Sequence, residues 1–354
     1  MTVMSDDIKR ERLAGQGAGM TDKTAEAPRD YLFDNMRAFL IILVVWGHIL
    51  TAMIFDYDMI KSIYYFLFFF HMPAMSFISG YFSKNLEKSR SNAFVTILVP
   101  YLILNVINYG YKIFILREQY FGFRFFNPQF GLWYLLALFL WKLFLKDLVK
   151  IRFLLPLSFV FGILSGYSKE FSTYLALGRV FCFLPFFLLG YYCTKEHVEK
   201  LRRIPKPVFA AVAVVTALLS AFVAYKDIFK VEVLYLRKPY PEDDTLHHML
   251  FRLLVYVIAV AMIAVLVNLI SKRRCFLSRI GTSTMTVYIL HLFTTPSLAK
   301  LELFQDRPYL YLIYSVFMTA LITYLYSLPI VKRIYDTFMD KLTALVIKKN
   351  NEEN

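Results

Sequence analysis

The residues best suited to chemistry are ionisable side chains inside long apolar stretches of the chain. One such stretch, FDNMRAFLIILVVWGHILTAM, contains Asp34, Arg37 and His48. If it is a helix, Asp34 and Arg37 lie three residues apart and can pair on one face. Arg37 and His48 are eleven residues apart, a rotation of about 1100°, or roughly 20° beyond three full turns. They therefore share a face, and the helix rise places His48 about 16 Å deeper than Arg37.

Two further histidines lie in the middle of apolar stretches. His71 is followed closely by Pro73, which loosens a helix locally and frees backbone carbonyls, and His291 lies in STMTVYILHLF. A single buried histidine is as often structural as catalytic, but three at similar depth favour one shared polar site. Such a site suits a general base working beside an oxyanion donor, or a proton relay in a transporter. Metal binding is a further alternative, but no Asp or Glu is evident nearby, and we expect no metal.

Other polar groups inside apolar stretches are Asn105, Asn108, Arg179 and Arg252. Each arginine lies near the end of its stretch, so it can extend its head group to the membrane surface in a structural role. Each arginine is equally suited to bind an anionic or polyhydroxyl acceptor, and the sequence does not decide between these readings.

The elements that would position these residues are membrane-spanning helices. The 354 residues are 58% apolar, with 35 Phe and 25 Tyr, which is typical of a polytopic all-α membrane protein. We predict about ten spans in one transmembrane domain, 31–332. They are 33–54, 62–82, 93–115, 131–145, 151–167, 178–194, 208–225, 248–270, 281–299 and 308–330.

The distribution of basic residues predicts the orientation of these spans. Of the 40 Lys and Arg residues, 26 fall in the two terminal segments and in alternate loops, and 10 fall in the other loops. Because basic loops stay inside, both termini are expected in the cytoplasm. This distribution explains the net charge of +14 without nucleic acid. Segment 1–30 is polar, with no apolar signal region, and is predicted to be a disordered cytoplasmic tail; 333–354 is predicted to be a second cytoplasmic tail.

The longest loop predicted outside, 226–247, is rich in Tyr, Pro and charge, including Tyr235 and Tyr240. It is either a solvated connector or a carbohydrate-binding surface. Cys182 and Cys193 are eleven residues apart in one predicted helix, too far for a disulfide, and Cys275 lies in a basic loop, so three free thiols are expected.

These residues resemble the acyltransferase 3 family of multispan membrane acyltransferases, most of all its fucose 4-O-acetylase-like branch. The resemblance rests on four motifs that span most of the chain, and the first of them contains the family's arginine–ten residues–histidine pattern as Arg37 and His48. The motifs are DNMRAFLIILVVWGH (34–48), FFFHMPAMSFISGYF (68–82), GLWYLLALF (131–139) and IGTSTMTVYILH (280–291).

The resemblance implies about ten helices and transfer of an acyl group from cytoplasmic acyl-CoA to a glycan. It implies that Arg37 and His48 are the essential pair, while His71, Trp133 and Tyr134 match the branch pattern. We therefore expect an O-acetyltransferase of a bacterial plasma membrane, with no permanently bound cofactor and with a cell-envelope carbohydrate as acceptor. His48 would act as base or as transient acyl carrier, Arg37 would meet the CoA phosphates, and Asp34, Trp133, Tyr134, Arg179, Arg252 and His291 would contribute to substrate binding.

Three hypotheses stay open from the sequence. The enzyme is the first, alone or beside other envelope-glycan assembly proteins. A non-enzymatic transporter of a glycan, a lipid or a proton-coupled solute is the second. A structural partner in a polysaccharide-assembly complex is the third, and it predicts that the histidines are dispensable.

Overall fold

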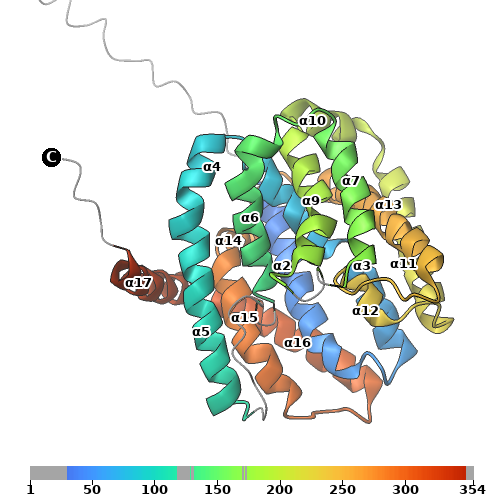
Figure 1. Ribbon diagram of the computed structural model, residues 1–354. Helices are drawn as coiled ribbons and strands as arrows, with labels where there is room; N and C mark the ends of the chain where they lie inside the picture. Colours follow the sequence, from blue (N-terminus) through green and yellow to red (C-terminus); the bar gives the residue numbers. More distant parts are fainter. Residues whose placement is uncertain (1–29, 118–127, 129–130, 170, 172–173, 348–354) are drawn as a thin grey trace, which may run out of the picture.

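Helices account for all the regular secondary structure in the part of the chain that the computed structural model describes, residues 30–117, 128, 131–169, 171 and 174–347 (Figure 1). The predicted all-α fold class is therefore confirmed for these residues. The α-helices are α2 (Leu32–Leu50), α3 (Asp58–Tyr81), α4 (Leu86–Ala93), α5 (Val99–Phe114), α6 (Trp133–Leu148), α7 (Leu154–Leu164), α9 (Leu177–Tyr192), α10 (Lys195–Arg203), α11 (Lys206–Tyr225), α12 (Val231–Leu234), α13 (Thr245–Leu269), α14 (Phe276–Thr282), α15 (Thr284–Ala299), α16 (Pro308–Tyr326) and α17 (Pro329–Val346).

Several helices begin where the sequence supplies a start signal. Pro308 and Pro329 open α16 and α17, where a missing backbone N–H costs nothing because that N–H has no partner within the helix. The side chains of Asn85 and Thr194 cap α4 and α10 by accepting from backbone N–H groups of the first turn.

The number of spans is confirmed only in part. Each of the ten predicted segments contains a helix, but in the described residues six helices are long and apolar enough to cross a membrane. They begin at Leu32, Asp58, Leu86, Lys206, Thr245 and Pro308, and the one that begins at Leu86 includes both α4 and α5 and ends at Phe114. The helix pair α9 and α10, bent by 92°, counts as a seventh if it forms one span. The others fall short of the roughly 20 residues that a bilayer requires: α6 and α15 have 16 residues each, and α7 has 11.

A close helix crossing lies between α3 and α9, and it depends on two glycines. A Cβ atom on Gly80 would lie 1.8 Å from the carbonyl oxygen of Phe187, and one on Gly190 would lie 1.8 Å from that of Phe77. Both contacts are with backbone, which cannot move aside as a side chain can. Small residues at such crossings allow helix backbones in membranes to pack closely. This crossing fixes α3, which carries His71, against α9, which carries Arg179.

Gly80→Ala should destabilise the protein, because the added methyl group forces α3 and α9 apart. The expected loss is about 1–3 kcal/mol, the usual cost of overpacking a well-packed site. Thermal unfolding of the purified protein in detergent would measure it. Gly110→Ala is the matched control, since its Cβ would meet only the Phe114 ring at 3.9 Å. Equal melting temperatures for the two variants would contradict this account of the crossing.

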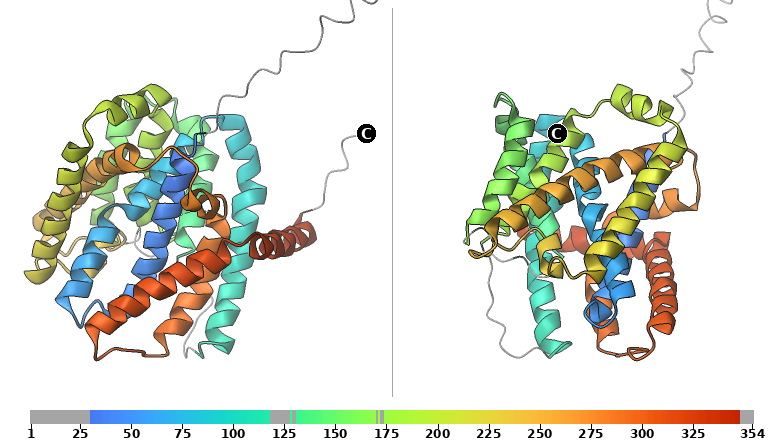
Figure 2. Two further views of the ribbon diagram at one scale, coloured as in Figure 1. Left: turned by 180° about the vertical axis from the view of Figure 1, so that it is seen from behind. Right: turned by 90° about the vertical axis from the view of Figure 1, so that its right-hand side faces the viewer.

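Helix α2 lies inside the bundle and packs against α3, α14, α15 and α16 (Figure 2). Its beginning is tied to the loop that joins α13 to α14. The Asn35 amide donates to the carbonyls of Ser271 and Arg273, at 2.8 and 3.0 Å, and accepts from the Ser278 hydroxyl at 2.7 Å. These bonds fix the entry of α2, and with it the position of Arg37 two residues later.

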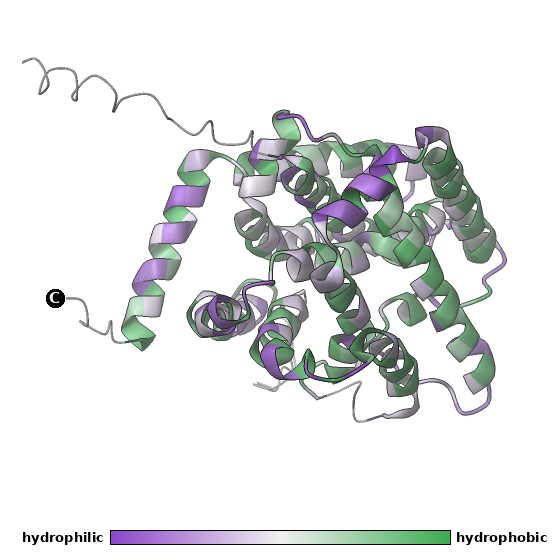
Figure 3. Ribbon diagram, turned by 90° about the horizontal axis from the view of Figure 1, so that it is seen from above, coloured by the Kyte–Doolittle hydropathy of each residue, from purple (hydrophilic) through white to green (hydrophobic). Residues whose placement is uncertain are grey.

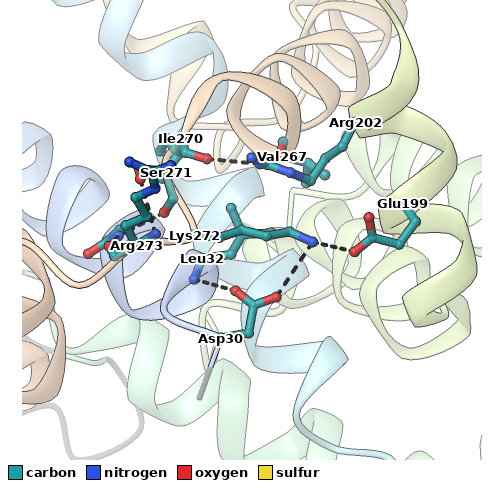
Figure 4. Close-up of polar contacts among 10 residues, drawn as sticks. Asp30, Leu32, Glu199, Arg202, Val267, Ile270, Ser271, Lys272 and Arg273 are labelled. Atoms are coloured by element: carbon teal, nitrogen blue, oxygen red, sulfur yellow. Dashed lines mark hydrogen bonds and ion pairs between the residues drawn. The ribbon is translucent and has the colours of Figure 1, made fainter. Parts of the chain in front are cut away.

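Basic residues hold α10 against the same loop (Figure 4). Lys272 forms ion pairs with Asp30 and with Glu199 of α10. Arg202 donates to the carbonyls of Val267 and Ile270, at 2.6 and 2.8 Å. The beginning of α2 and the helix that follows α9 therefore lie at one end of the molecule, so α2 and α9 run in opposite directions.

The segment assigned to a C-terminal tail, 333–354, is helical as far as Val346. Helix α17 begins at Pro329, contacts α5, and extends away from the bundle (Figures 1 and 2). Ile330, Ile334 and Phe338 recur at a four-residue spacing and are exposed. Apolar and polar residues alternate along this helix, as both colours in Figure 3 show. The pattern is that of an amphipathic helix.

The cytoplasmic position of both termini stays a prediction, and Cys275 offers a direct test. Cys275 is exposed, whereas Cys182 and Cys193 are buried, so an impermeant maleimide should have one target. We expect no labelling in intact cells and labelling after permeabilisation. A chain carrying Cys275→Ser and Glu242→Cys should behave oppositely, because Glu242 lies in the loop predicted outside. Labelling of Cys275 in intact cells would overturn the proposed orientation.

Candidate active site

Arg37 and His48 belong to one uninterrupted helix, α2. The separation of about 16 Å that the sequence predicted therefore follows from the helix rise. Near the beginning of the helix, the Arg37 guanidinium lies 3.9 Å from the carboxylate of Asp34 and 4.4 Å from the centre of the Phe82 ring. These contacts hold Arg37 in place while leaving it partly exposed.

A cavity of about 210 Å³, here called the histidine cavity, lies at the other end of α2. Its walls come from α2, α3, α6, α9, α15 and the segment after α12, and they are mostly polar or aromatic. The polar and aromatic residues among them are His48, Thr51, Tyr64, Phe68, His71, Trp133, Arg179, Phe183, Tyr235, Arg237 and Tyr288.

His71 enters this cavity with a defined tautomer. Its Nδ1 lies 2.6 Å from the carbonyl oxygen of Leu67, one turn earlier in α3. A carbonyl can only accept, so Nδ1 carries the proton and Nε2 is an acceptor when the ring is neutral.

His291 lies next to His48 but does not line the histidine cavity. It is fully buried, and its ring centre is 5.2 Å from that of His48. Its Nδ1 lies 3.0 Å from the Val287 carbonyl, which fixes the same tautomer as in His71. Its Nε2 is buried without a hydrogen-bond partner. A buried acceptor of this kind is costly unless it is used, and it lies beside the ring of His48.

A second cavity, of about 300 Å³, contains Arg37 and is here called the Arg37 cavity. It is lined also by Ser79, Tyr134 and Tyr288. Tyr134 bonds Ser79 through its hydroxyl at 2.8 Å, and its ring centre lies 6.2 Å from that of Tyr288. Tyr288 lines both cavities, so the Arg37 cavity and the histidine cavity adjoin at this residue.

A third cavity, of about 290 Å³, reaches His48 from another direction. It is lined by Asn108, Tyr111 and Lys112 of α5 and shares His48 and Thr51 with the histidine cavity. His48 therefore lines two cavities.

Trp133 and Arg179 form one wall of the histidine cavity. The Arg179 guanidinium lies 4.7 Å from the Trp133 ring, within cation–π range. The neighbouring residue, Tyr134, faces the Arg37 cavity instead. The start of α6 thus contributes to both cavities.

Residues 30–327 match the family model described as an acyltransferase domain, which covers most of the chain. The chain belongs to the acyltransferase 3 family. It is therefore a membrane acyltransferase, and all three cavities lie within the matched region, whereas α17 lies beyond it. Searches of curated proteins and of solved structures returned no match.

The structure separates Arg252 from the other predicted site residues of this acyltransferase. Arg252 is 3% exposed and does not line any of the three cavities. It donates to the carbonyls of Gly162 and Lys238 and to the Ser165 hydroxyl, and it lies 4.5 Å from the Tyr240 ring. These contacts are those of a residue that joins α7 to the loop after α12. Of the two roles considered for Arg252, structural support and acceptor binding, these contacts fit structural support.

Four lining residues of the histidine cavity with polar side chains were not singled out in the sequence: Thr51, Tyr64, Arg237 and Tyr288. Tyr64 bonds Tyr235 through their hydroxyls at 3.0 Å, and the Tyr288 hydroxyl donates to the Gly131 carbonyl. Tyrosine is so frequent in this chain that its presence alone carries no signal. Tyr235 was singled out, and it does lie at the cavity. Among the described residues, no group of three or more His, Cys, Asp or Glu is arranged to hold a metal ion.

Proposed function

We propose that the protein is an O-acetyltransferase that moves an acetyl group from cytoplasmic acetyl-CoA to a carbohydrate of the cell envelope. The observation that carries the proposal is that Tyr288 lines both the Arg37 cavity and the histidine cavity, so the cavity that contains Arg37 adjoins the cavity that contains His48.

The Arg37 cavity is the proposed donor entrance. An arginine is charged at every relevant pH, and its planar fork can hold phosphate oxygens bidentately. With the CoA phosphates at Arg37, the extended pantetheine arm would carry the thioester past Tyr288 toward His48. The helix rise of about 16 Å between the two residues sets the distance to be spanned.

His48 is the proposed general base. In the reaction, an acceptor hydroxyl gives its proton to the His48 imidazole as the hydroxyl oxygen bonds to the thioester carbonyl carbon. The C–S bond then breaks, and the CoA thiolate takes the proton from the imidazolium and leaves as the thiol. His291, with its free Nε2 beside His48, is a proposed positioning residue that stabilises the imidazolium.

The aromatic walls of the histidine cavity support a carbohydrate acceptor. Trp133, Tyr64 and Tyr235 line the cavity with aromatic surface that a sugar ring can contact, and the tyrosine hydroxyls offer hydrogen bonds. We further propose a bacterial plasma membrane as the location and other envelope-glycan assembly proteins as partners.

Mass spectrometry of envelope glycans from cells with and without the gene tests this proposal. Loss of glycan acetylation at constant glycan export supports the enzyme. The three adjoining cavities also suit a transporter, which is the alternative candidate, and that function predicts loss of export instead. Unchanged acetylation and export would refute both functions.

A further inference from the structure

The histidine cavity carries positive charge that the proposed reaction does not use. Arg179 and Arg237 both line it, and none of its described lining residues is acidic. Arg179 is half-buried there, and a charge in a partly apolar, aromatic cavity is costly unless an opposite charge accompanies it, whereas Arg237 lines the cavity from an exposed position. The cavity is therefore electrostatically suited to an anionic ligand.

These two arginines are separate from the proposed phosphate site at Arg37. Arg179 lies in the first turn of α9, and α9 runs opposite to α2 because Lys272 ties the start of α2 to α10, directly after α9. Arg37 lies in the second turn of α2. Arg179 therefore lies with His48 at the histidine cavity and away from Arg37, so one CoA headgroup at Arg37 does not account for Arg179 and Arg237.

The surroundings of Arg179 also define what kind of anion fits. Its guanidinium lies against the Trp133 ring, which leaves its planar edge for bidentate contact with a carboxylate or phosphate. Tyr64 and Tyr235, joined by their hydroxyls, line the same cavity. An acidic sugar combines an anionic group with a ring that can contact aromatic side chains, so it is the kind of ligand that fits this cavity.

We propose that the histidine cavity selects an acceptor sugar bearing a carboxylate or phosphate, which Arg179 and Arg237 bind while a hydroxyl of the same sugar meets His48. This inference rests on the proposed function for the role of acceptor. The charge selectivity itself is independent of the reaction.

The fluorescence of Trp133 reports on this charge directly. The chain has three tryptophans, Trp46, Trp133 and Trp141. Trp46 is replaced by phenylalanine, and Trp141 is 2% exposed and inaccessible to quenchers, so changes in fluorescence quenching come from Trp133. The protein is placed in nanodiscs of phosphatidylcholine, and iodide and acrylamide are compared as anionic and neutral quenchers at constant ionic strength.

Arg179→Gln and Arg237→Gln should each lower the iodide quenching constant by about threefold, the size expected on removing one charge near a partly solvated site, and leave acrylamide quenching unchanged. Arg179→Lys, which keeps the charge, should behave as the parent does. Lys238→Gln is the matched control, because Lys238 adjoins Arg237 in sequence but does not line the cavity. Iodide quenching that does not depend on either arginine would overturn the inference.

Glucuronate and glucose then test the ligand class. Glucuronate should protect Trp133 from iodide in the parent, and glucose at the same concentration should not. Equal protection by both sugars, or by neither, would overturn the assignment. Charge selectivity without any acetyl transfer would refute the proposed function, and with it the role of acceptor, but would leave the selectivity of the cavity for an acidic sugar standing. Acetyl transfer without charge selectivity would support the proposed function and overturn this inference.

Discussion

Replacing His48 by glutamine is expected to abolish acetyl transfer and leave acetyl-CoA binding nearly intact. Glutamine keeps polarity and approximate size but cannot take a proton, and loss of a general base typically costs about 10²–10⁴-fold in rate. Because His48 lies about 16 Å along α2 from Arg37, the phosphate contacts should not change. Product formation and acetyl-CoA affinity, both measured on purified and folded protein, give the two results.

His247→Gln is the control for this variant, since His247 is exposed at the start of α13 and outside the cavities. Activity of His48→Gln within a few-fold of the parent would remove His48 from the reaction. An acetyl-histidine detected at position 48 after exposure to acetyl-CoA without acceptor would assign it the carrier role instead of the base role.

Arg37→Lys is expected to weaken acetyl-CoA binding by about 10- to 100-fold, the loss of one or two charge-assisted hydrogen bonds. Lysine keeps the charge but lacks the fork that holds two phosphate oxygens. Affinity for acetyl-pantetheine, which lacks the nucleotide and its phosphates, should not change. Calorimetry with both donors on the same preparation measures the difference.

Arg90→Lys provides a matched control, because Arg90 pairs with Asp147 and is absent from the Arg37 cavity. If Arg37→Lys binds acetyl-CoA normally but loses transfer, Arg37 belongs to the reacting centre or to packing around Asp34. That outcome would remove the donor entrance from the account.

The parts of the site that sequence could predict are those set within one helix. Arg37 and His48 share α2, so the helix repeat alone fixes their relation. His71 and His291 lie in α3 and α15, and the depth predicted for each came from its position within its own apolar stretch. The amphipathic pattern of α17, with Ile330, Ile334 and Phe338 four residues apart, is equally local, but the sequence analysis assigned this segment to a tail and did not predict the helix.

The rest depends on contacts between residues far apart in the chain. Arg252 looked equivalent to Arg179 in sequence, yet its partners Gly162 and Ser165 lie in and after α7 and draw it away from the cavity. That Tyr288 lines both cavities depends on where α15 meets the start of α6, at the Tyr134 and Tyr288 rings. The span count is confirmed only in part for a different reason, since apolar composition finds helices but does not find their lengths.

The most direct test of the account is the transfer of label from [acetyl-¹⁴C]acetyl-CoA in membrane vesicles from the native cells. In inverted vesicles, which present the cytoplasmic face, the parent protein should place base-labile label on envelope glycan. His48→Gln should place none, and sealed right-side-out vesicles should place none with either protein. Equal labelling by the parent and His48→Gln in inverted vesicles, or labelling by the parent in right-side-out vesicles, would contradict transfer at His48 from a donor that enters at Arg37.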